Sequence, residues 1–104
     1  MRYDIVLAPE AIEDLDKLKA NLRATVRDAL EAHLRHQPTK ATKSRIKRLR
    51  GLSRPQYRLR VGNDIRAFYD VIEQCVEVLA IVSKSKADAW LAKHGETDET
   101  SSSV

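Results

Sequence analysis

A run of positively charged residues in the second half of the chain has the composition of a phosphate-binding surface. Residues 48–66 contain six arginines, and Arg58 and Arg60 are two positions apart, as are side chains that share one face of a β-strand. Arginine stays protonated at neutral pH and presents a planar set of donors that matches the oxygens of a phosphate or a carboxylate. The spacing therefore predicts a surface that binds an anion between guanidinium groups.

The charge of the whole chain is unevenly distributed. Residues 40–66 carry ten Lys and Arg residues and one acid, Asp64, whereas the remaining residues carry nine Lys and Arg residues and fourteen acids. One interpretation of such a basic run is a face that is simply solvated. A patch this concentrated in an otherwise acidic chain also fits a polyanionic partner, with nucleic acid as the first candidate.

Length and composition limit the class of protein. A chain of 104 residues fits one domain, and 42% hydrophobic with 33% charged residues suits a soluble globular protein. Cys75 is the single cysteine, so no internal disulfide is expected, and no Cys/His spacing indicates zinc. We therefore predict no metal, no cofactor, no membrane segment or signal peptide, and a cytoplasmic protein.

The elements that position the arginines can be placed from the patterning. Tyr3–Ala8 has the composition of a strand, and Pro9 suits the first turn of a helix. A second helix is expected from a cap at Asn21 to Leu34, so that the two helices form a helical hairpin.

The second half of the chain is predicted to be mainly strands. Residues 37–56 indicate a basic loop with a short extended piece at Ile46–Leu49. Three strands are then predicted, followed by a helix with Ser85 as its cap and Gly95 at its end; these segments cover 57–61, 65–72, 75–83 and 85–95.

Together these elements predict an α+β fold: a small antiparallel β-sheet, with the helical hairpin packed on one face and a short C-terminal helix, in the order β-α-α-β-β-β-α. Residues 1–95 form the single domain, and residues 96–104 form a polar tail.

The loop lengths decide which strand residues share a face. A three-residue loop at 62–64 pairs Val61 with Ile65, Leu59 with Ala67 and Tyr57 with Tyr69, which gives one apolar face. A two-residue turn at Glu73–Gln74 adds further apolar residues to this face, namely Val76, Val78, Ala80 and Val82.

The opposite face is then charged as well as apolar, with Arg60 directly across from Arg66. Like charges in such a pair destabilise a sheet by roughly 0.2–1 kcal/mol, and a bound anion would reverse that effect. Alternatively, these arginines extend into water or pair with Asp70 and Glu77. The same face holds Phe68, Leu79 and Ile81, which we expect the C-terminal helix, a nucleobase or a partner's helix to cover.

The order of these motifs resembles the RelE/ParE superfamily of bacterial toxin–antitoxin toxins over about residues 2–93. The resemblance rests on "LRG" at 49–51, on "YRLRVGNDIRAFYDV" from Tyr57, and on "VEVLAIVSKSKADAWL" from Val76. It implies a small antiparallel sheet with two N-terminal helices on one face.

The resemblance to the RelE branch implies a ribosome-dependent mRNA endoribonuclease that inhibits translation without a metal, and that has ribosomal RNA and a cognate antitoxin as partners. In that reaction the 2′-OH attacks the adjacent phosphate and leaves a cyclic phosphate and a 5′-OH. The ParE branch implies instead a non-enzymatic inhibitor of DNA gyrase. A member that only binds its antitoxin is a third alternative, because the late tyrosine of the family motif is missing here.

The catalytic residues carried over by position are basic. Arg58 and Arg60 match two family lysines, Arg66 matches the family arginine, and Lys84 or Lys86 stands in for later basic residues. Arginine is a poor general base, so Arg60 is expected to stabilise charge, and a lysine with a lowered pKa would transfer protons.

The predicted RNA-binding residues lie mostly in the basic loop, where they would contact phosphates. Trp90 is added because it falls near the family's aromatic position; it would either stack on a base or anchor the last helix. The full set is Lys43, Arg45, Lys47, Arg48, Arg50, Arg54 and Trp90.

Overall fold

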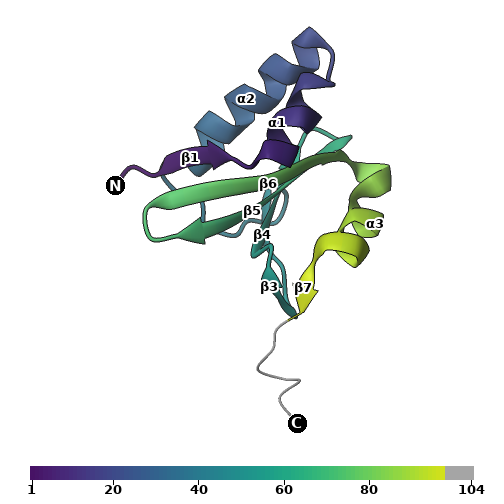
Figure 1. The fold of residues 1–104 in the computed structure, drawn as a ribbon. Coiled ribbons are helices and arrows are strands. Elements are labelled where there is room, and N and C mark those ends of the chain that lie inside the picture. Colours follow the sequence, from purple (N-terminus) through teal and green to yellow (C-terminus); the bar gives the residue numbers. More distant parts are fainter. Residues whose placement is uncertain (98–104) are drawn as a thin grey trace.

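The computed structural model describes residues 1–97, which form a five-stranded sheet, a two-stranded sheet and three helices (Figure 1). In chain order these elements are β1 (Asp4–Leu7), α1 (Pro9–Asp16), α2 (Ala20–Leu34), β2 (Ile46–Arg48), β3 (Leu52–Arg54), β4 (Tyr57–Val61), β5 (Ile65–Ile72), β6 (Cys75–Ser83), α3 (Lys84–His94) and β7 (Glu96–Thr97).

The five-stranded sheet has the strand order β1-β6-β5-β4-β2. The predicted α+β class and the order of the main elements are confirmed. The sheet is mixed, however, whereas the sequence predicted antiparallel strands throughout. β1 runs parallel to β6, and the amides of Asp4 and Ala8 donate to the carbonyls of Gln74 and Val78 at 2.8 Å. A parallel pair needs a long crossover, which the chain between β1 and β6 supplies.

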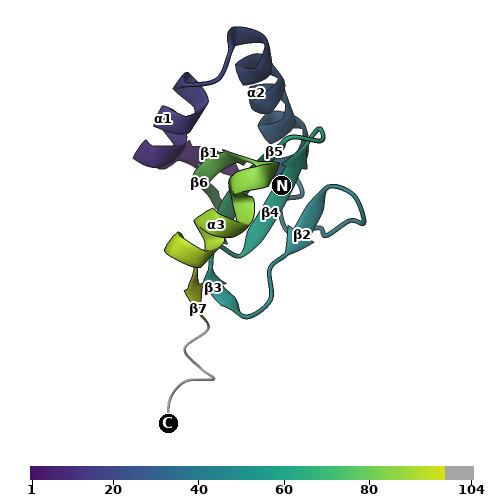
Figure 2. The same ribbon diagram turned by 90° about the vertical axis from the view of Figure 1, so that its right-hand side faces the viewer.

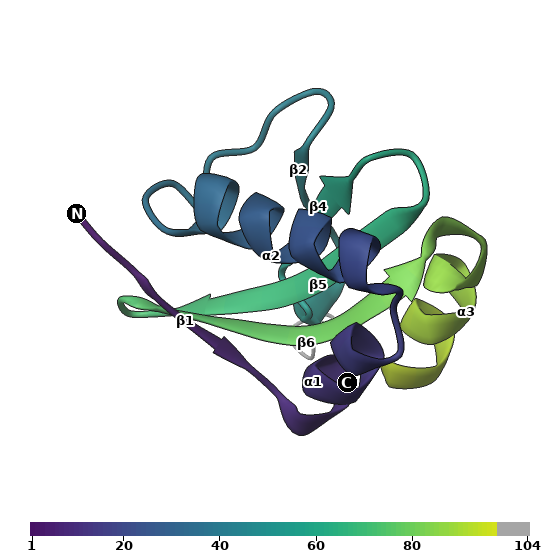
Figure 3. The ribbon, with the colours of Figure 1, turned by 90° about the horizontal axis from the view of Figure 1, so that it is seen from above.

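α1 and α2 cover one face of the sheet, as predicted (Figure 3). Their apolar side chains share one core with β2, β4, β5 and β6, because each helix presents an apolar stripe that the sheet removes from water. The buried residues of this core include Ala11, Leu15, Val26, Leu30, Leu34, Ile46, Leu59, Val61, Ile65, Ala67, Tyr69, Val76, Val78 and Ile81.

The junction between the two helices differs from the prediction. α2 begins at Ala20 with Lys19 in the cap position, so the prediction of Asn21 as the cap was wrong. Arg23 fixes the junction instead, because its guanidinium donates to the carbonyls of Leu15, at 3.3 Å, and Leu18, at 2.9 Å, near the end of α1. Helix ends leave such carbonyls without partners inside the helix.

The predicted register of the β4–β5 hairpin is confirmed. Val61 pairs with Ile65, and Arg60 pairs with Arg66, on either side of a three-residue loop. Gly62 in this loop has a φ of 60°, in the left-handed region that glycine adopts without strain.

β6 contains an irregularity at Leu79 that the sequence did not reveal. Tyr69 pairs with Val78 and Phe68 pairs with Ala80, which leaves Leu79 without a partner. Such a bulge adds one residue to one strand, so that the alternation of faces is reversed beyond it.

The reversal corrects the predicted faces of the second half of β6. Ile81 belongs to the core. Ala80 and Val82 instead pair with Phe68 and Arg66, on the opposite face of the sheet. The amide of Ile81 donates to the Asp14 carboxylate of α1 at 2.9 Å. A contact between residues so distant in sequence therefore helps to hold the bulge.

The C-terminal elements also differ from the prediction in detail. α3 begins at Lys84, with Ser83 rather than Ser85 in the cap position, whereas Gly95 caps its C-terminal end as predicted. Glu96–Thr97, the start of the predicted tail, forms β7 and pairs with β3, two strands that the sequence did not predict. The rest of the predicted tail, 98–104, lies outside the described residues.

Candidate nucleic-acid interface

Basic side chains from three neighbouring strands meet on the sheet face opposite α1 and α2. Lys47 of β2 lies across from Arg58 of β4, and Arg60 lies across from Arg66 of β5. The amide of Arg60 also donates to the carbonyl of Arg45 at 2.8 Å, which continues the pairing beyond the end of β2. We call Lys47, Arg58, Arg60 and Arg66 the basic face.

A cavity of about 270 Å³ opens between the basic face and α3. It brings together three of the predicted catalytic residues, Arg58, Arg66 and Lys84, with Lys47. Its remaining lining is Leu49, Phe68, Ala87, Asp88 and Leu91. Four cationic groups against one carboxylate make this cavity suited to a phosphate group flanked by an apolar base or sugar.

Arg58 contains an unsatisfied donor in this cavity. Its Nε is buried and has no hydrogen-bond partner among the described residues. A buried donor without a partner costs about 1–3 kcal/mol. An anion bound in the cavity would neutralise the Arg58 guanidinium, whose charge lies beside those of Arg66, Lys47 and Lys84.

Arg60 and Arg66 are both held by the loop that joins their strands. Arg66 Nη1 donates to the carbonyl of Asn63 at 3.4 Å, and Arg60 Nη2 donates to Asn63 Oδ1 at 2.8 Å. Arg66 is only 6% exposed. Burial first, and then the charges of Arg58 and Arg60, lower the pKa of Arg66. Arg60 lines a separate small cavity with Arg45.

α3 folds back along the sheet (Figure 2), and aromatic stacking attaches it there. The rings of Phe68 and Trp90 are 5.0 Å apart at 5° between their planes, and His94 lies 5.2 Å from Trp90 on the same helix. One face of the indole is thus covered by Phe68. Trp90 therefore anchors α3, and its role in stacking on RNA stays a prediction.

The other predicted RNA-binding residues lie outside the cavity and in different surroundings. Arg48 Nη1 donates to the carbonyl of Gln56 at 2.8 Å, and its guanidinium lies 5.2 Å from the centre of the Tyr57 ring. Lys43 and Arg50 are exposed, as is Lys86 of α3, the one predicted catalytic lysine that does not line the cavity.

Arg54 is engaged by acidic side chains. Its Nε lies 3.3 Å from Asp70 Oδ2, and its Nη2 lies 3.2 Å from Glu77 Oε1. Burial raises the pKa of Asp70, although the Gln56 amide and Arg54 both favour the charged carboxylate. The alternative that Arg60 and Arg66 pair with Asp70 and Glu77 is therefore not realised within residues 1–97, where Arg54 engages both acids instead.

Asp88 is the residue in the cavity that sequence reasoning missed. It follows Lys84 by four positions, and residues at this spacing share one face of a helix. That spacing in "KSKAD" is the signal that would have placed both side chains together. Between residues 1 and 97, no three His, Cys, Asp or Glu side chains form a group that could hold a metal ion. No helix in this part of the chain is long and apolar enough to cross a bilayer.

Solved structures with the same fold are toxins and toxin–antitoxin complexes. A mutant of the E. coli toxin RelE in the free state matches with a TM-score of 0.68 at 19% identity, covering 86% of this chain and 92% of that one. The Mycobacterium tuberculosis RelBE2 complex matches with a TM-score of 0.66 at 22% identity, covering 81% of this chain and 100% of that one. The Pyrococcus horikoshii RelE–RelB complex matches with a TM-score of 0.61 at 23% identity, covering 83% and 99%.

Comparison with curated protein sequences gives no match. Comparison with protein families matches residues 5–88 to the ParE toxin of the type II toxin–antitoxin system parDE. This match spans β1 to the start of α3 and includes all four residues of the basic face. The chain therefore belongs to the ParE toxin family of type II toxin–antitoxin systems, within the superfamily that the sequence motifs predicted.

Proposed function

We propose that this toxin is a ribosome-dependent mRNA endoribonuclease that inhibits translation in the cytoplasm. The observation that carries the proposal is the grouping of four cationic side chains, Arg58, Arg66, Lys47 and Lys84, around one cavity. The scissile phosphate of an RNA strand would neutralise the clustered charge.

The lining residues suit transfer of the phosphodiester to the neighbouring 2′-oxygen. Arg58 and Arg66 bind the non-bridging oxygens and stabilise the charge that develops on them. Asp88, which carries the one carboxylate of the lining, takes the proton of the 2′-OH as this oxygen forms its bond to phosphorus. The bond from phosphorus to the 5′-oxygen breaks, and the Lys84 ammonium gives its proton to the leaving oxygen. The products are a 2′,3′-cyclic phosphate and a 5′-OH.

The exposed cations outside the cavity serve affinity. Lys43 and Arg50 lie in the loops that flank β2, at the edge of the sheet. There they would contact phosphates of ribosomal RNA without reading sequence. A cognate antitoxin is the expected protein partner, since solved structures of the same fold include the RelE–RelB complex from Pyrococcus horikoshii.

The proposal is tested by mapping RNA ends in a reconstituted translation reaction. We expect new 5′-OH ends only when ribosomes and protein are both present, and a 2′,3′-cyclic phosphate on the upstream fragment. Arg58→Gln should abolish these ends, and Arg27→Gln, the same change on the exposed side of α2, should not. Intact message, or ends that also form on free RNA, would contradict ribosome-dependent cleavage.

The second candidate function is non-enzymatic inhibition of DNA gyrase. It is favoured by the description of the matching family, which is that of the parDE toxin. In this case the basic face would bind an acidic protein surface, and Asp88 would have no chemical role.

A further inference from the structure

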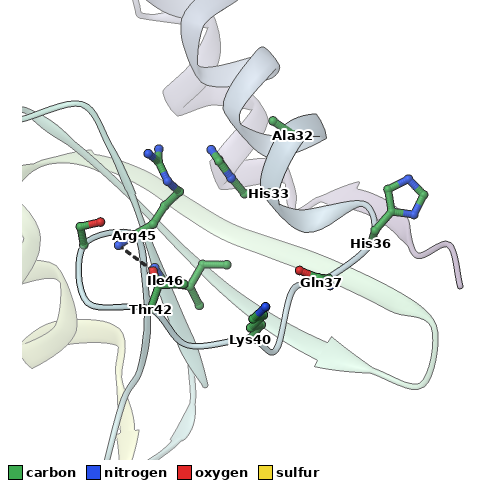
Figure 4. Close-up of a pocket in the computed structure, with 9 residues that line it drawn as sticks. Ala32, His33, His36, Gln37, Lys40, Thr42, Arg45 and Ile46 are labelled. Atoms are coloured by element: carbon green, nitrogen blue, oxygen red, sulfur yellow. Dashed lines mark hydrogen bonds between the residues drawn. The ribbon is translucent and has the colours of Figure 1, made fainter.

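A second cavity, of about 310 Å³, lies on the other side of β2 from the candidate catalytic cavity. It is enclosed by the C-terminal end of α2 and by the loop that leads into β2 (Figure 4). Its lining consists of Ala32, His33, His36, Gln37, Lys40, Thr42, Ser44, Arg45 and Ile46. None of these residues carries a carboxylate, although the chain outside residues 40–66 is acidic.

The charged and titratable groups of this cavity are all basic. Figure 4 shows the Arg45 guanidinium beside the imidazole of His33. Burial first, and then the charge of Arg45, lower the pKa of His33. Lys40 is a further cation on the loop, whereas His36 Nδ1 lies 3.2 Å from the carbonyl of Met1 and is engaged there. The positive charges therefore oppose one another in the absence of a counter-ion.

Hydroxyl groups complete the donor set. Thr42 Oγ1 accepts the amides of Arg45, at 3.0 Å, and Ile46, at 3.1 Å. These two contacts fix the loop and leave the Thr42 hydroxyl hydrogen as a donor. Ser44 supplies a second hydroxyl to the lining. Cations combined with hydroxyl donors are the contacts that proteins make to nucleic-acid phosphates.

This cavity is continuous with the basic face. Ser44 and Arg45 also line the small cavity that contains Arg60, Gly62 and Asn63. Arg60 is in turn paired with Arg66, which lines the candidate catalytic cavity. A path of basic side chains thus runs from that cavity, around the end of β2, to His33.

We propose that the cavity between α2 and the 39–46 loop is a second phosphate site, which binds a backbone phosphate of RNA away from the cleaved bond. The choice of RNA as the ligand rests on the proposed function, whereas the phosphate site itself does not depend on it. Lys40 and Arg45 provide the charge, His33 gains a proton as the anion binds, and Thr42 and Ser44 provide hydroxyl donors. An RNA strand is favoured over an acidic peptide because the basic path continues to the candidate catalytic cavity, whose lining combines cationic with apolar side chains.

The test follows the imidazole signals of His33 by NMR in the full chain, with His94 as the internal control on α3. The probes are inorganic phosphate, and a short 2′-O-methyl RNA that has no 2′-OH and is not cleaved. Each probe should raise the pKa of His33, since a bound anion favours the imidazolium form, and should leave the pKa of His94 unchanged. These changes in pKa do not depend on cleavage, so they should be observed even if the protein does not cleave RNA.

Variants make the assignment specific. Arg45→Gln should abolish the response of His33 to phosphate. It should also lower the affinity for the 2′-O-methyl RNA about tenfold, and reduce the slope of log affinity against log salt by the amount that one phosphate contact contributes. Arg27→Gln makes an equal charge change on α2, the helix that carries His33, but outside the cavity. It should affect neither measurement.

Three results would overturn the proposal. The first is a His33 signal that responds no more than that of His94. The second is a response to inorganic phosphate but not to the RNA, which would indicate a site for the free ion. The third is an equal response to an acidic peptide of the same charge, which would indicate a protein partner.

Discussion

Arg60 and Arg66 lie directly across from each other on β4 and β5, and both donate to Asn63 in the connecting loop. The side chain of Asn63 accepts from Arg60, and its carbonyl accepts from Arg66 at 3.4 Å. The repulsion expected between paired like charges is thus offset by acceptors within the hairpin. The loop holds the two guanidinium groups in place before any anion binds.

Arg66→Ala is expected to abolish toxicity while the protein stays folded. Arg66 lines the catalytic cavity and is buried. Its loss therefore removes a positively charged hydrogen-bond donor that an exposed lysine or arginine cannot replace. Cleavage in a translation extract should fall at least about a hundredfold, with an unchanged circular dichroism spectrum. If the folded variant arrests growth as the wild type does, Arg66 does not bind the reacting phosphate.

Asp88→Asn is expected to slow cleavage by about a hundredfold or more, because the proton acceptor is lost. Affinity for ribosomes should be retained or increased, because a negative charge leaves a basic cavity. Asp28→Asn, on the exposed side of α2, is the matched control. Equal cleavage rates for both variants would assign the proton transfer to another group.

Much of the sheet could be predicted from the sequence, because alternation of apolar and charged residues admits one register for the β4–β5 hairpin. The bulge at Leu79 could not, since apolar residues occupy both faces of β6 and either alternation buries a side chain. The observed alternation is stabilised by the hydrogen bond from the Ile81 amide to Asp14, which is 67 positions away in the sequence.

The site was predicted in part for a similar reason. Arg58 and Arg66 share a face through local pairing, and their grouping followed from the register. Asp88 and Lys84 reach the same cavity only because α3 folds back over the sheet, a position fixed by the stacking of Trp90 on Phe68. Nothing in the sequence near Arg54 indicated that Asp70 and Glu77 would engage it.

Trp90→Ala is expected to loosen α3, because a helix of eleven residues is marginal without packing. Loss of the half-buried ring and its stacking should lower the free energy of unfolding by about 2 kcal/mol. Amide hydrogen exchange should accelerate over residues 84–94, and Trp90→Phe should restore most of the protection. Unchanged exchange in the alanine variant would mean that other contacts hold α3.

The pH dependence of stability should carry a contribution from Asp70. Its pKa is raised in the folded state, chiefly by burial, so folding favours the protonated acid. The stabilisation from this group therefore increases as the pH falls through the raised value toward the ordinary 3.8, and is lost as the pH rises. Urea unfolding of wild type and Asp70→Asn should diverge in this sense, and the opposite sign would contradict the direction of the shift.

Lys43→Gln and Arg50→Gln are expected to weaken ribosome binding without changing the rate of cleavage by bound toxin. Both cations are exposed and lie outside the catalytic cavity. Each lost phosphate contact should flatten the dependence of log affinity on log salt by about 0.7–0.9. Co-sedimentation at several salt concentrations measures this slope, and an unaltered slope in the double variant would exclude these residues from the interface.

The most direct test of the proposed function compares one preparation of the toxin in two assays. In the first, the 5′ ends of mRNA are mapped in a translation extract; in the second, DNA gyrase supercoils a relaxed plasmid. We predict that wild-type toxin cleaves mRNA on the ribosome and leaves supercoiling unaffected, and that Arg58→Gln neither cleaves mRNA nor inhibits supercoiling. Inhibited supercoiling together with intact mRNA would contradict the proposal and identify the protein as a gyrase inhibitor.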